Sequence, residues 1–267
     1  MMSSSAPSRD DLGHPVGLAR PARRVVSLVP SLTEAVAATR AEALVGATQW
    51  CTHPADLEVQ RVRGTKNPDL GAVTGLRPDL VLANKEENRR LDVERLRAAG
   101  VPVWVTDIRT LDEAIASLRR MFNTALGWPE PPWLAQAERA WRQPAPGPAA
   151  RAAIAIWRDP WMVVGSGTFA GDIAARLGLD NVYGTDRERY PHIDVDDVAE
   201  RRTDLVVLPD EPYPFSPDDG PEMFPGRRVA LVEGRSLTWY GPSLVSARSL
   251  LLSQIAHAAS RPRGDSG

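Results

Sequence analysis

The sequence predicts an α/β protein made of two related halves, each with a central parallel sheet covered by helices. Short apolar runs rich in β-branched residues recur along the chain, and strands buried on both faces of a parallel sheet have this composition. One run nearly repeats: residues 77–82 read Arg-Pro-Asp-Leu-Val-Leu, residues 202–207 read Arg-Thr-Asp-Leu-Val-Val, and each leads into an acidic loop. A weaker match relates residues 23–29 to residues 227–232.

Length and charge narrow the class of protein. The chain has 267 residues, which is enough for one large domain or two of ordinary size. Its 32 basic and 34 acidic residues are interspersed, so the net charge is only -2 and no nucleic-acid partner is expected. Cys51 is the only cysteine, which excludes an intramolecular disulfide.

The two ends of the chain are predicted to be disordered tails, over residues 1–22 and 261–267. The first tail has no apolar stretch of the length that a secretory signal needs, and no window of the chain reaches the ~20 apolar residues of a membrane span. As written, the sequence therefore predicts a cytoplasmic protein without membrane insertion. A wrongly assigned start that hides a signal peptide would instead place the protein in the periplasm.

The first half begins with a predicted strand at residues 25–29, which ends at Pro30. Ser31 and Glu34 then fit a capping box, with the serine as N-cap and the glutamate three residues later, so a helix is expected to follow as far as residue 39. The helix at 111–126 is predicted from apolar residues that recur every three or four positions. Further strands are predicted at 44–47, 80–83 and 103–106, and further helices at 69–76 and 91–99.

A proline-rich middle separates the halves. Residues 128–132 break the helix at 111–126, and residues 143–148 cannot continue the next predicted helix, at 133–141. A glycine-rich turn at 164–168 lacks the lysine of a phosphate-binding loop and is expected to be a tight turn capped by Ser166 or Thr168. The second half is predicted to have strands at 152–157, 162–164, 205–208 and 229–232, and helices at 168–177 and 243–259.

These elements predict an N-terminal lobe over residues 23–110, a helical segment with a proline-rich linker over 111–148, and a C-terminal lobe over 149–260. Ligands of open α/β sheets lie outside the carboxyl ends of the strands, so the loops after the strands are the expected site. Aromatic and polar residues gather in these loops and could line a cleft that stacks on a flat ligand and bonds its edges. They are Trp50 with His53, Lys66 with Asn67, Asn84 with Lys85, Trp157 with Trp161, Tyr190 with His192, Tyr213 with Phe215, and Trp239 with Tyr240.

Within this set, the lysines are expected to contact the ligand, whereas three of the aromatic residues are expected to have structural roles. Lys66 and Lys85 are the only lysines in the chain, and a compact ammonium is not interchangeable with an arginine fork, so a polar contact from either to the ligand is expected. Trp157 and Trp161 are instead predicted to pack in the core or at its rim, and Tyr213, between prolines, to form a rigid turn.

Motifs of catalysis are absent from the sequence: it has no Gly-x-Ser-x-Gly, no phosphate-binding Gly-x-x-x-x-Gly-Lys and no His-Glu-x-x-His. Cys51 and His53 are two positions apart, which is not by itself a catalytic geometry. His53 and His192, with Tyr190 or Asp194 nearby, could ligate a metal or a haem iron, but histidines satisfied within loops are the favoured interpretation. The sequence therefore predicts neither an enzyme nor a metal site.

Four segments carry a resemblance to a known family: residues 26–34, 45–54, 64–70 and 77–84. They resemble the iron-complex and cobalamin class of ABC-transporter substrate-binding proteins, the helical-backbone metal receptors. The resemblance covers roughly residues 23–260. It implies two α/β lobes with central parallel sheets, bridged by a long rigid helix within residues 111–141, with the ligand in the cleft between the lobes.

The resemblance also implies roles for individual residues. Ser31 and Trp50 fall where the family contacts its ligand, and Tyr190 takes the place of a ligand-facing tryptophan. The family docks on its permease through one carboxylate per lobe; Asp196 matches the second, whereas the first falls at Gly71, with Asp69 as the nearest acid. The remaining ligand-binding residues implied or expected are Thr65, Lys66, Asn84, Lys85, Met162, Trp239 and Tyr240.

The sequence thus predicts a non-catalytic, monomeric receptor for a metal-centred small molecule in an ABC-type uptake system. Cobalamin or another corrinoid is preferred over a ferric siderophore or haem, no covalently bound cofactor is expected, and ABC permease subunits are the implied partners. The alternative is a cytoplasmic accessory protein or enzyme that handles corrinoid, haem or ferric siderophore in the same cleft.

Overall fold

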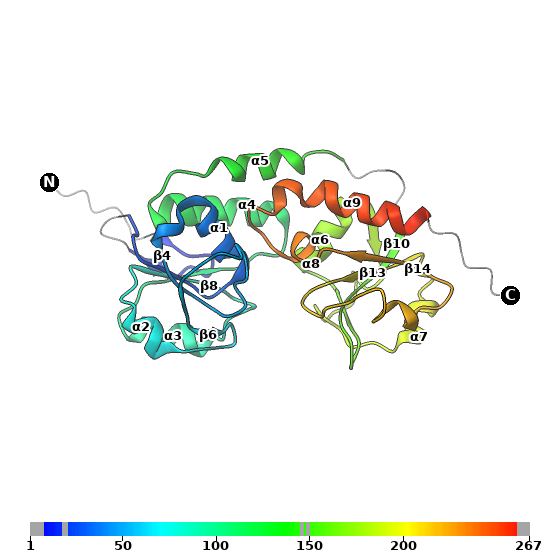
Figure 1. Ribbon diagram of the computed structural model, residues 1–267, viewed down its shortest axis with the longest axis horizontal. Coiled ribbons are helices and arrows are strands. Elements are labelled where there is room, and N and C mark those ends of the chain that lie inside the picture. The colour runs from blue at the N-terminus through cyan, green and yellow to red at the C-terminus, as the bar shows by residue number, and fades with distance from the viewer. Residues whose placement is uncertain (1–7, 18–20, 145–146, 148–149, 261–267) are drawn as a thin grey trace. The chain divides into compact units, whose positions relative to one another are not determined.

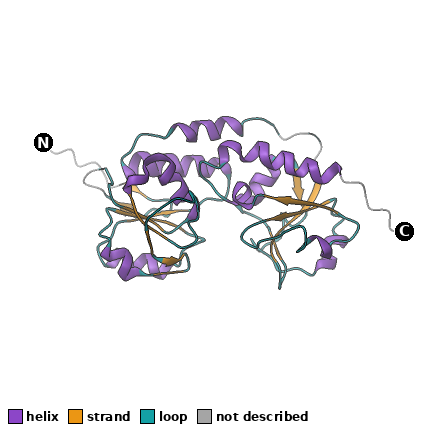
Figure 2. Cartoon of the chain, viewed as in Figure 1, coloured by secondary structure: helices purple, strands orange, loops and turns teal. Residues whose placement is uncertain are grey.

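In the computed structural model, each half of the chain is built around a parallel sheet, and the two sheets have the same order of strands (Figures 1 and 2). The first sheet runs in the order β4-β3-β8-β9, with β3 at Val25–Ser27, β4 at Leu44–Ala47, β8 at Leu80–Asn84 and β9 at Val103–Thr106. The second runs β12-β10-β13-β14, with β10 at Ala150–Trp157, β12 at Leu179–Asn181, β13 at Leu205–Pro209 and β14 at Arg228–Val232. The predicted α/β class is confirmed.

Each sheet carries one further short strand. β5 (Gln60–Arg61) runs parallel to β4, and β11 (Met162–Val163) runs antiparallel to β10. Two small hairpins complete the strands of the described residues: β1 (Ser8–Arg9) with β2 (Pro15–Val16), and β6 (Arg63–Gly64) with β7 (Asn67–Pro68).

Helices lie on both faces of each sheet. In the first sheet's half, α1 lies on one face and α2 with α3 on the other (Figure 1). The short helices α7 and α8 were not predicted. The helices are α1 (Pro30–Arg40), α2 (Leu70–Gly75), α3 (Arg90–Ala98), α4 (Leu111–Arg120), α5 (Pro132–Ala140), α6 (Phe169–Arg176), α7 (Val195–Glu200), α8 (Gly234–Thr238) and α9 (Leu244–Ser260).

The structure describes residues 8–17, 21–144, 147 and 150–260, and the chain divides into two units. Unit 1 consists of Met1–Ile108, Asp112–Ala135 and Tyr240–Pro242, and unit 2 consists of Arg109–Leu111, Gln136–Trp239 and Ser243–Gly267. A segment distant in sequence, Tyr240–Pro242, therefore belongs to unit 1. The predicted C-terminal tail, 261–267, lies outside the described residues.

The helical segment that follows β9 in the chain is not one long helix. α4 continues as a π-helix at Met121–Leu126 and ends at Gly127, which adopts the left-handed conformation with φ 66°. Glycine reaches this conformation without strain, and it commonly ends helices. α5 then starts anew at Pro132, so the long helix implied by the family resemblance is divided here into two.

The predicted capping box at the start of α1 is wrong. Val29 is the N-cap residue, Pro30 occupies the first turn, and no side chain caps this end. Proline fits the first turn because it has no N–H to leave unpaired. The Ser31 side chain is thereby released from capping, and the residue is 3% exposed. At α6 the prediction is confirmed: the Thr168 side chain accepts a hydrogen bond from the Gly171 N–H.

The N-terminal segment is ordered over residues 8–17, so the prediction of a disordered tail is wrong there; residues 1–7 and 18–20 lie outside the described part. The Asp10 carboxylate accepts hydrogen bonds from the Leu12 N–H (3.0 Å) and the His14 N–H (2.8 Å), which closes the hairpin. It also pairs with Arg97 at 2.7 Å. The Asp11 N–H donates to the Val105 carbonyl (3.1 Å), so the hairpin is tied to β9.

The internal repeat is a structural one. Asp79 accepts hydrogen bonds from the backbone N–H groups of Arg23 and Arg24, at 2.8 and 3.0 Å. In the same way, Asp204 accepts from the Arg151 N–H at 3.1 Å. Each aspartate precedes the third parallel strand of its sheet and binds the start of the first. The Arg-x-Asp-Leu-Val repeat therefore anchors neighbouring strands.

The repeat extends backwards through the preceding helix. α2 and α7 each follow an N-cap aspartate, Asp69 and Asp194. Each helix is followed by an arginine with positive φ, 46° at Arg77 and 52° at Arg202. The weaker match, 23–29 with 227–232, does not hold in the structure: it pairs β3, a first strand, with β14, a fourth strand.

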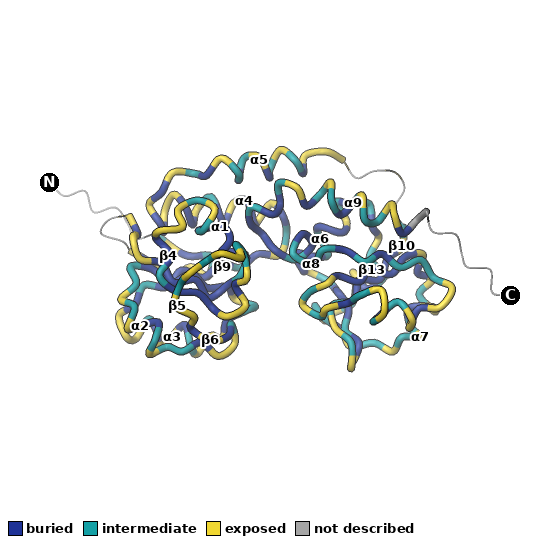
Figure 3. Tube along the Cα trace, in the orientation of Figure 1, coloured by how far each residue is buried: buried dark blue, intermediate teal, exposed yellow. Residues whose placement is uncertain are grey.

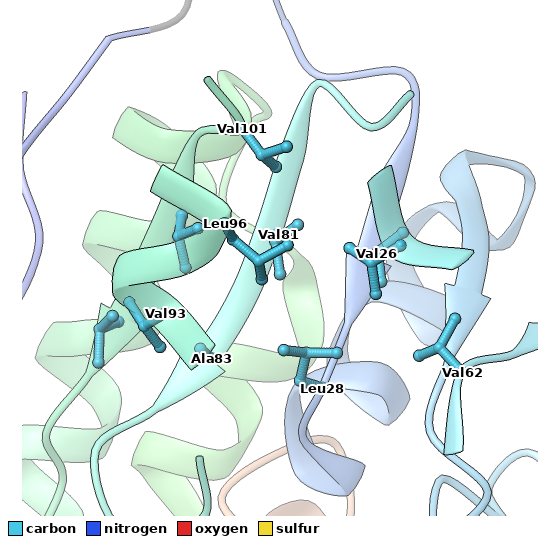
Figure 4. Packing of buried hydrophobic residues seen from close by; sticks show 11 residues of the cluster. Val26, Leu28, Val62, Val81, Ala83, Val93, Leu96 and Val101 are labelled. Carbon is cyan, nitrogen blue, oxygen red and sulfur yellow. The ribbon is translucent and has the colours of Figure 1, made fainter. Parts of the chain in front are cut away.

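The buried residues of each unit concentrate on the central strands (Figure 3). Figure 4 shows the core of unit 1 between the sheet and α3, where Val26, Val81 and Val93 pack with Leu96. The core of unit 2 is more aromatic and includes Trp161, Tyr183, Phe215 and Phe224. Each sheet therefore has a packed hydrophobic core behind the loops at its carboxyl edge.

Candidate functional site

The strand order of both sheets defines where a ligand is most readily bound. When the order is second-first-third-fourth, the crossovers diverge between the first and third strands, and a crevice opens outside their carboxyl ends. In unit 1 this switch point lies after β3 and β8, and in unit 2 it lies after β10 and β13. Three of these four loops, those after β8, β10 and β13, are among the aromatic and polar loops predicted from the sequence; the loop after β3 is not.

Two asparagine side chains connect the loops of the unit 1 switch point by hydrogen bonds. The Asn88 amide donates to the carbonyl of Leu28, after β3, and to that of Thr65, at 3.3 and 3.0 Å. The Asn84 amide, at the end of β8, donates to the Thr106 hydroxyl at 3.1 Å. Asn84 is 3% exposed. Of the predicted ligand-binding residues, Asn84 and Thr65 are thus used to hold the loops in place.

Glu87, in the loop after β8, is an ionisable group with a shifted pKa. Burial raises its pKa from 4.5 to about 7, against the opposing effects of the Lys66 charge and a hydrogen bond from Tyr240. Tyr240 is 5% exposed. Its phenol also hydrogen-bonds the hydroxyls of Ser31 and Thr106. Burial, followed by the negative charge of Glu87, raises the pKa of Tyr240 well above its ordinary value, so the phenol stays neutral.

The segment that delivers Tyr240 fits closely against the start of α1. A Cβ added to Gly241 would lie 3.0 Å from the Glu34 Oε2 atom and 3.1 Å from the Ser31 carbonyl oxygen. Only glycine fits this approach without displacement. The predicted ligand-binding residues Ser31 and Tyr240 are therefore brought together, although they lie near opposite ends of the sequence.

Lysine and tryptophan side chains occupy the exposed rim of this site. The Lys66 ammonium donates to the Glu86 carbonyl, so it lies over the acidic loop. The Lys85 ammonium pairs with Asp107 at 2.7 Å. Trp50 is 58% exposed, and a Cβ on Gly64 would lie 3.1 Å from its ring nitrogen. Trp50 thus lies over glycine backbone and presents much of its ring to solvent.

A second glutamate with a raised pKa, the half-buried Glu211, lies just after β13 in unit 2. Burial, with the neighbouring Asp210 charge, raises the pKa of Glu211 from 4.5 to about 7, while a hydrogen bond from Trp239 and the Arg235 charge oppose the shift. A Cβ on Gly234 would lie 2.5 Å from the Glu211 carbonyl oxygen. Trp239 itself is 8% exposed. Neither Glu87 nor Glu211 was singled out from the sequence, although the acidic loop after each repeated strand was its signal.

The remaining predicted ligand residues of unit 2 lie around β11. The backbones of Met162 and His192 pair with each other in an isolated antiparallel β-bridge. Tyr190 is half-buried in the same loop, which is held by a hydrogen bond from the Val163 N–H to the Pro191 carbonyl at 3.1 Å. The structure therefore brings Met162, Tyr190 and His192 into one region of unit 2.

The predicted docking carboxylates lie at the starts of equivalent helices. Asp69 is the N-cap of α2 and accepts a hydrogen bond from the Ala72 N–H at 2.9 Å. Asp196 is exposed in the first turn of α7, two positions after the N-cap Asp194. The same position in α2 is Gly71. The acid of unit 1 is thus displaced by two residues relative to that of unit 2.

Chemistry other than binding finds little support. Cys51 is buried, accepts a hydrogen bond from Thr33 at 3.0 Å, and has a pKa raised by burial, which disfavours the reactive thiolate. The His53 ring lies 3.2 Å from the Thr52 hydroxyl. Within the described residues, no group of three His, Cys, Asp or Glu side chains is placed to hold a metal ion. The described helices also include none that is long and apolar enough to span a bilayer.

The fold is that of the two-lobed periplasmic binding proteins. The chain superposes on the periplasmic vitamin B12 binding protein of Vibrio cholerae with a TM-score of 0.72 and 18% identity, over 90% of this chain and 99% of that one. It superposes on a periplasmic heme binding protein from Pseudomonas aeruginosa with a TM-score of 0.71 and 23% identity, over 90% and 94%.

The chain is also similar in sequence to proteins that are named vitamin B12-binding proteins. The chain is 28% identical over 205 residues to the vitamin B12-binding protein of Pectobacterium carotovorum, covering 71% of this chain and 72% of the relative. No family model matches. The resemblance to the iron-complex and cobalamin class of ABC-transporter substrate-binding proteins is confirmed. These relatives are named as binding proteins, and the solved ones as periplasmic, so the comparisons do not support the expected cytoplasmic location.

Proposed function

We propose that this protein is the substrate-binding protein of an ABC-type uptake system for a metal-centred small molecule, with cobalamin or another corrinoid as the preferred ligand. The observation that carries the proposal is the similarity to vitamin B12-binding proteins over 71% of the chain, in a fold whose switch points hold aromatic and hydrogen-bonding side chains. Trp50, 58% exposed, offers a stacking surface in unit 1, and Tyr190 offers another in unit 2.

The proposal places the protein outside the cytoplasm, as a monomer that delivers its ligand to permease subunits. Asp69 and Asp196 are the proposed docking carboxylates, because Asp69 is the N-cap of α2 and Asp196 lies in the first turn of the equivalent helix α7. No enzymatic step is proposed, since the one thiol is buried and its ionisation is disfavoured.

Haem is the second candidate ligand. Tyr190 and His192 lie in one loop of unit 2, and both residue types ligate haem iron. The similarity of fold extends to a periplasmic heme binding protein with a TM-score of 0.71. An iron-bound haem would show the spectral signature of axial ligation, which Tyr190→Phe or His192→Ala would remove.

Titration of the purified protein with cyanocobalamin, haemin and a ferric siderophore tests the proposal. We expect micromolar or tighter affinity for cyanocobalamin, about -8 kcal/mol of binding free energy. Trp50→Ala and Tyr190→Ala should each weaken it about 10-fold, since a lost stacking contact costs about 1.4 kcal/mol. Leu91→Ala removes an exposed side chain on α3 and is the matched control. If none of the three complexes binds, the receptor function is refuted.

A further inference from the structure

Trp157 lies at the switch point of the unit 2 sheet. It is the last residue of β10, and Tyr213 lies in the loop after β13, so the two side chains flank the switch point of this sheet. Trp157 is 41% exposed, unlike Trp161, which is 7% exposed. The prediction that both tryptophans pack in the core or at its rim is thus right for Trp161, whereas Trp157 leaves a large apolar ring open to solvent.

The open ring is held in place by an aromatic series that runs into the core. The rings of Trp157 and Tyr213 meet edge to face, with centroids 5.5 Å apart and an interplanar angle of 80°. The ring centroids of Tyr213 and Phe215 are 4.6 Å apart. The Phe215 ring in turn stacks on that of Trp161, with centroids 5.6 Å apart. The Tyr213 phenol also donates to Asp219 at 2.8 Å. A ligand stacking here would meet rings that are already ordered, which reduces the entropy cost of binding.

The charge around this pair is negative. Arg158, next to Trp157, is ion-paired with Asp219, with Glu222 at 2.8 Å and with Asp159 at 3.5 Å. Its single positive charge is therefore shared among three carboxylates, and the exposed Asp218 adds a fourth. A field of this sign attracts cations, tolerates neutral groups and repels carboxylates.

We infer that Trp157 and Tyr213 form an aromatic subsite on unit 2 that takes an uncharged or cationic face of the ligand and disfavours carboxylate-bearing complexes. The inference rests on the proposed function and specifies its ligand class. A corrinoid, whose ring periphery carries uncharged amides, fits this subsite. Haem, with its propionate carboxylates, and anionic ferric siderophores fit it less well.

The test has two arms, both measured by calorimetric titration of the full-length protein. In the first, Trp157→Ala and Tyr213→Ala should raise the Kd for cyanocobalamin about 10-fold, Trp157→Phe should raise it less, and Leu91→Ala should leave it unchanged. In the second, the double variant Asp218→Asn, Glu222→Gln should bind haemin at least about 3-fold more tightly than the wild type at low salt. Its cyanocobalamin affinity should stay the same, and high salt should abolish the gain for haemin.

The outcomes separate this inference from the proposed function. If the wild type binds cyanocobalamin and both alanine variants bind it equally well, the subsite is refuted while the receptor function stands. If charge removal leaves the ratio of haemin to cyanocobalamin affinity unchanged, the selectivity is refuted. If the wild type binds no metal complex, both proposals are overturned. Thermal melting of each variant shows whether an affinity loss comes from unfolding.

Discussion

Trp239 and Tyr240 are consecutive residues, yet each hydrogen-bonds the carboxyl of a different half-buried glutamate. Trp239 belongs to unit 2 and bonds Glu211, whereas Tyr240 belongs to unit 1 and bonds Glu87. Burial holds the pKa of each carboxyl at about 7. Glu211 thus holds Trp239 in unit 2, and Glu87 holds Tyr240 in unit 1. Both carboxyl groups change charge near neutral pH.

The first prediction concerns stability against pH. The folded-state pKa of Glu87, about 7, lies above its ordinary value of 4.5. Between these values the folded state binds more protons than the unfolded state, so stability falls as the pH rises through this window. We expect the melting temperature to fall between about pH 5 and about pH 8, and Glu87→Gln to make this fall shallower.

Calorimetric melting at several pH values checks this expectation. Glu211→Gln should act in the same direction, and the double variant should be the least sensitive to pH. Glu58→Gln, at an exposed position, is the control and should follow the wild type. Equal slopes for the wild type and the double variant would show that neither carboxyl is titrated in this range.

A second prediction concerns the N-terminal hairpin. The Asp10 carboxylate is fully buried and pairs with Arg97 at 2.7 Å, besides closing its own turn. Removing one partner of a buried pair leaves the other charge uncompensated, so Asp10→Ala should lower the free energy of unfolding by about 3 kcal/mol. Asp180→Ala breaks an exposed pair with Arg151 and should cost less than about 1 kcal/mol. Denaturant unfolding compares the two; similar costs would mean that the hairpin is dispensable.

The elements predicted best were those whose signal is local. The repeated Arg-x-Asp-Leu-Val sequence marks strands β8 and β13, because apolar β-branched residues and a preceding aspartate determine both. The hairpin at residues 8–17 was missed because its order depends on Arg97, far away in sequence. A polar, proline-containing segment gives no sign of such a partner.

The candidate site was predicted in part for the same reason. Trp50 and Tyr240 were proposed as ligand-binding residues because aromatic residues in loops after strands are visible in the sequence, and that role stays a prediction. The burial of Glu87 was not visible, since it depends on Tyr240 entering unit 1. Trp157 was predicted to pack in the core or at its rim, and only the structure shows how much of it is exposed.

A third prediction separates capping from docking. Asp69 both caps α2 and is a proposed docking carboxylate. Serine also caps helices well, so Asp69→Ser should keep the stability within about 0.5 kcal/mol, whereas Asp69→Ala should cost about 1 kcal/mol. If the carboxylate docks on a permease, both variants should reduce ligand uptake by cells while leaving ligand affinity unchanged. Normal uptake with Asp69→Ser would exclude the docking role.

The last prediction tests how tightly Tyr240–Pro242 must fit in unit 1. A Cβ at position 241 would lie 3.0 Å from Glu34 Oε2 and 3.1 Å from the Ser31 carbonyl oxygen, so Gly241→Ala should displace the segment and cost about 1 to 3 kcal/mol. Gly75→Ala is the matched control, because a Cβ there meets nothing within 4 Å in α2. Since alanine favours helices, that variant should be stabilised by up to about 1 kcal/mol.

Displacing Tyr240 should also weaken its bond to Glu87, so Gly241→Ala should alter the pH dependence of melting, whereas Gly75→Ala should not. A Gly241→Ala variant as stable as the wild type would show that the segment can shift without cost.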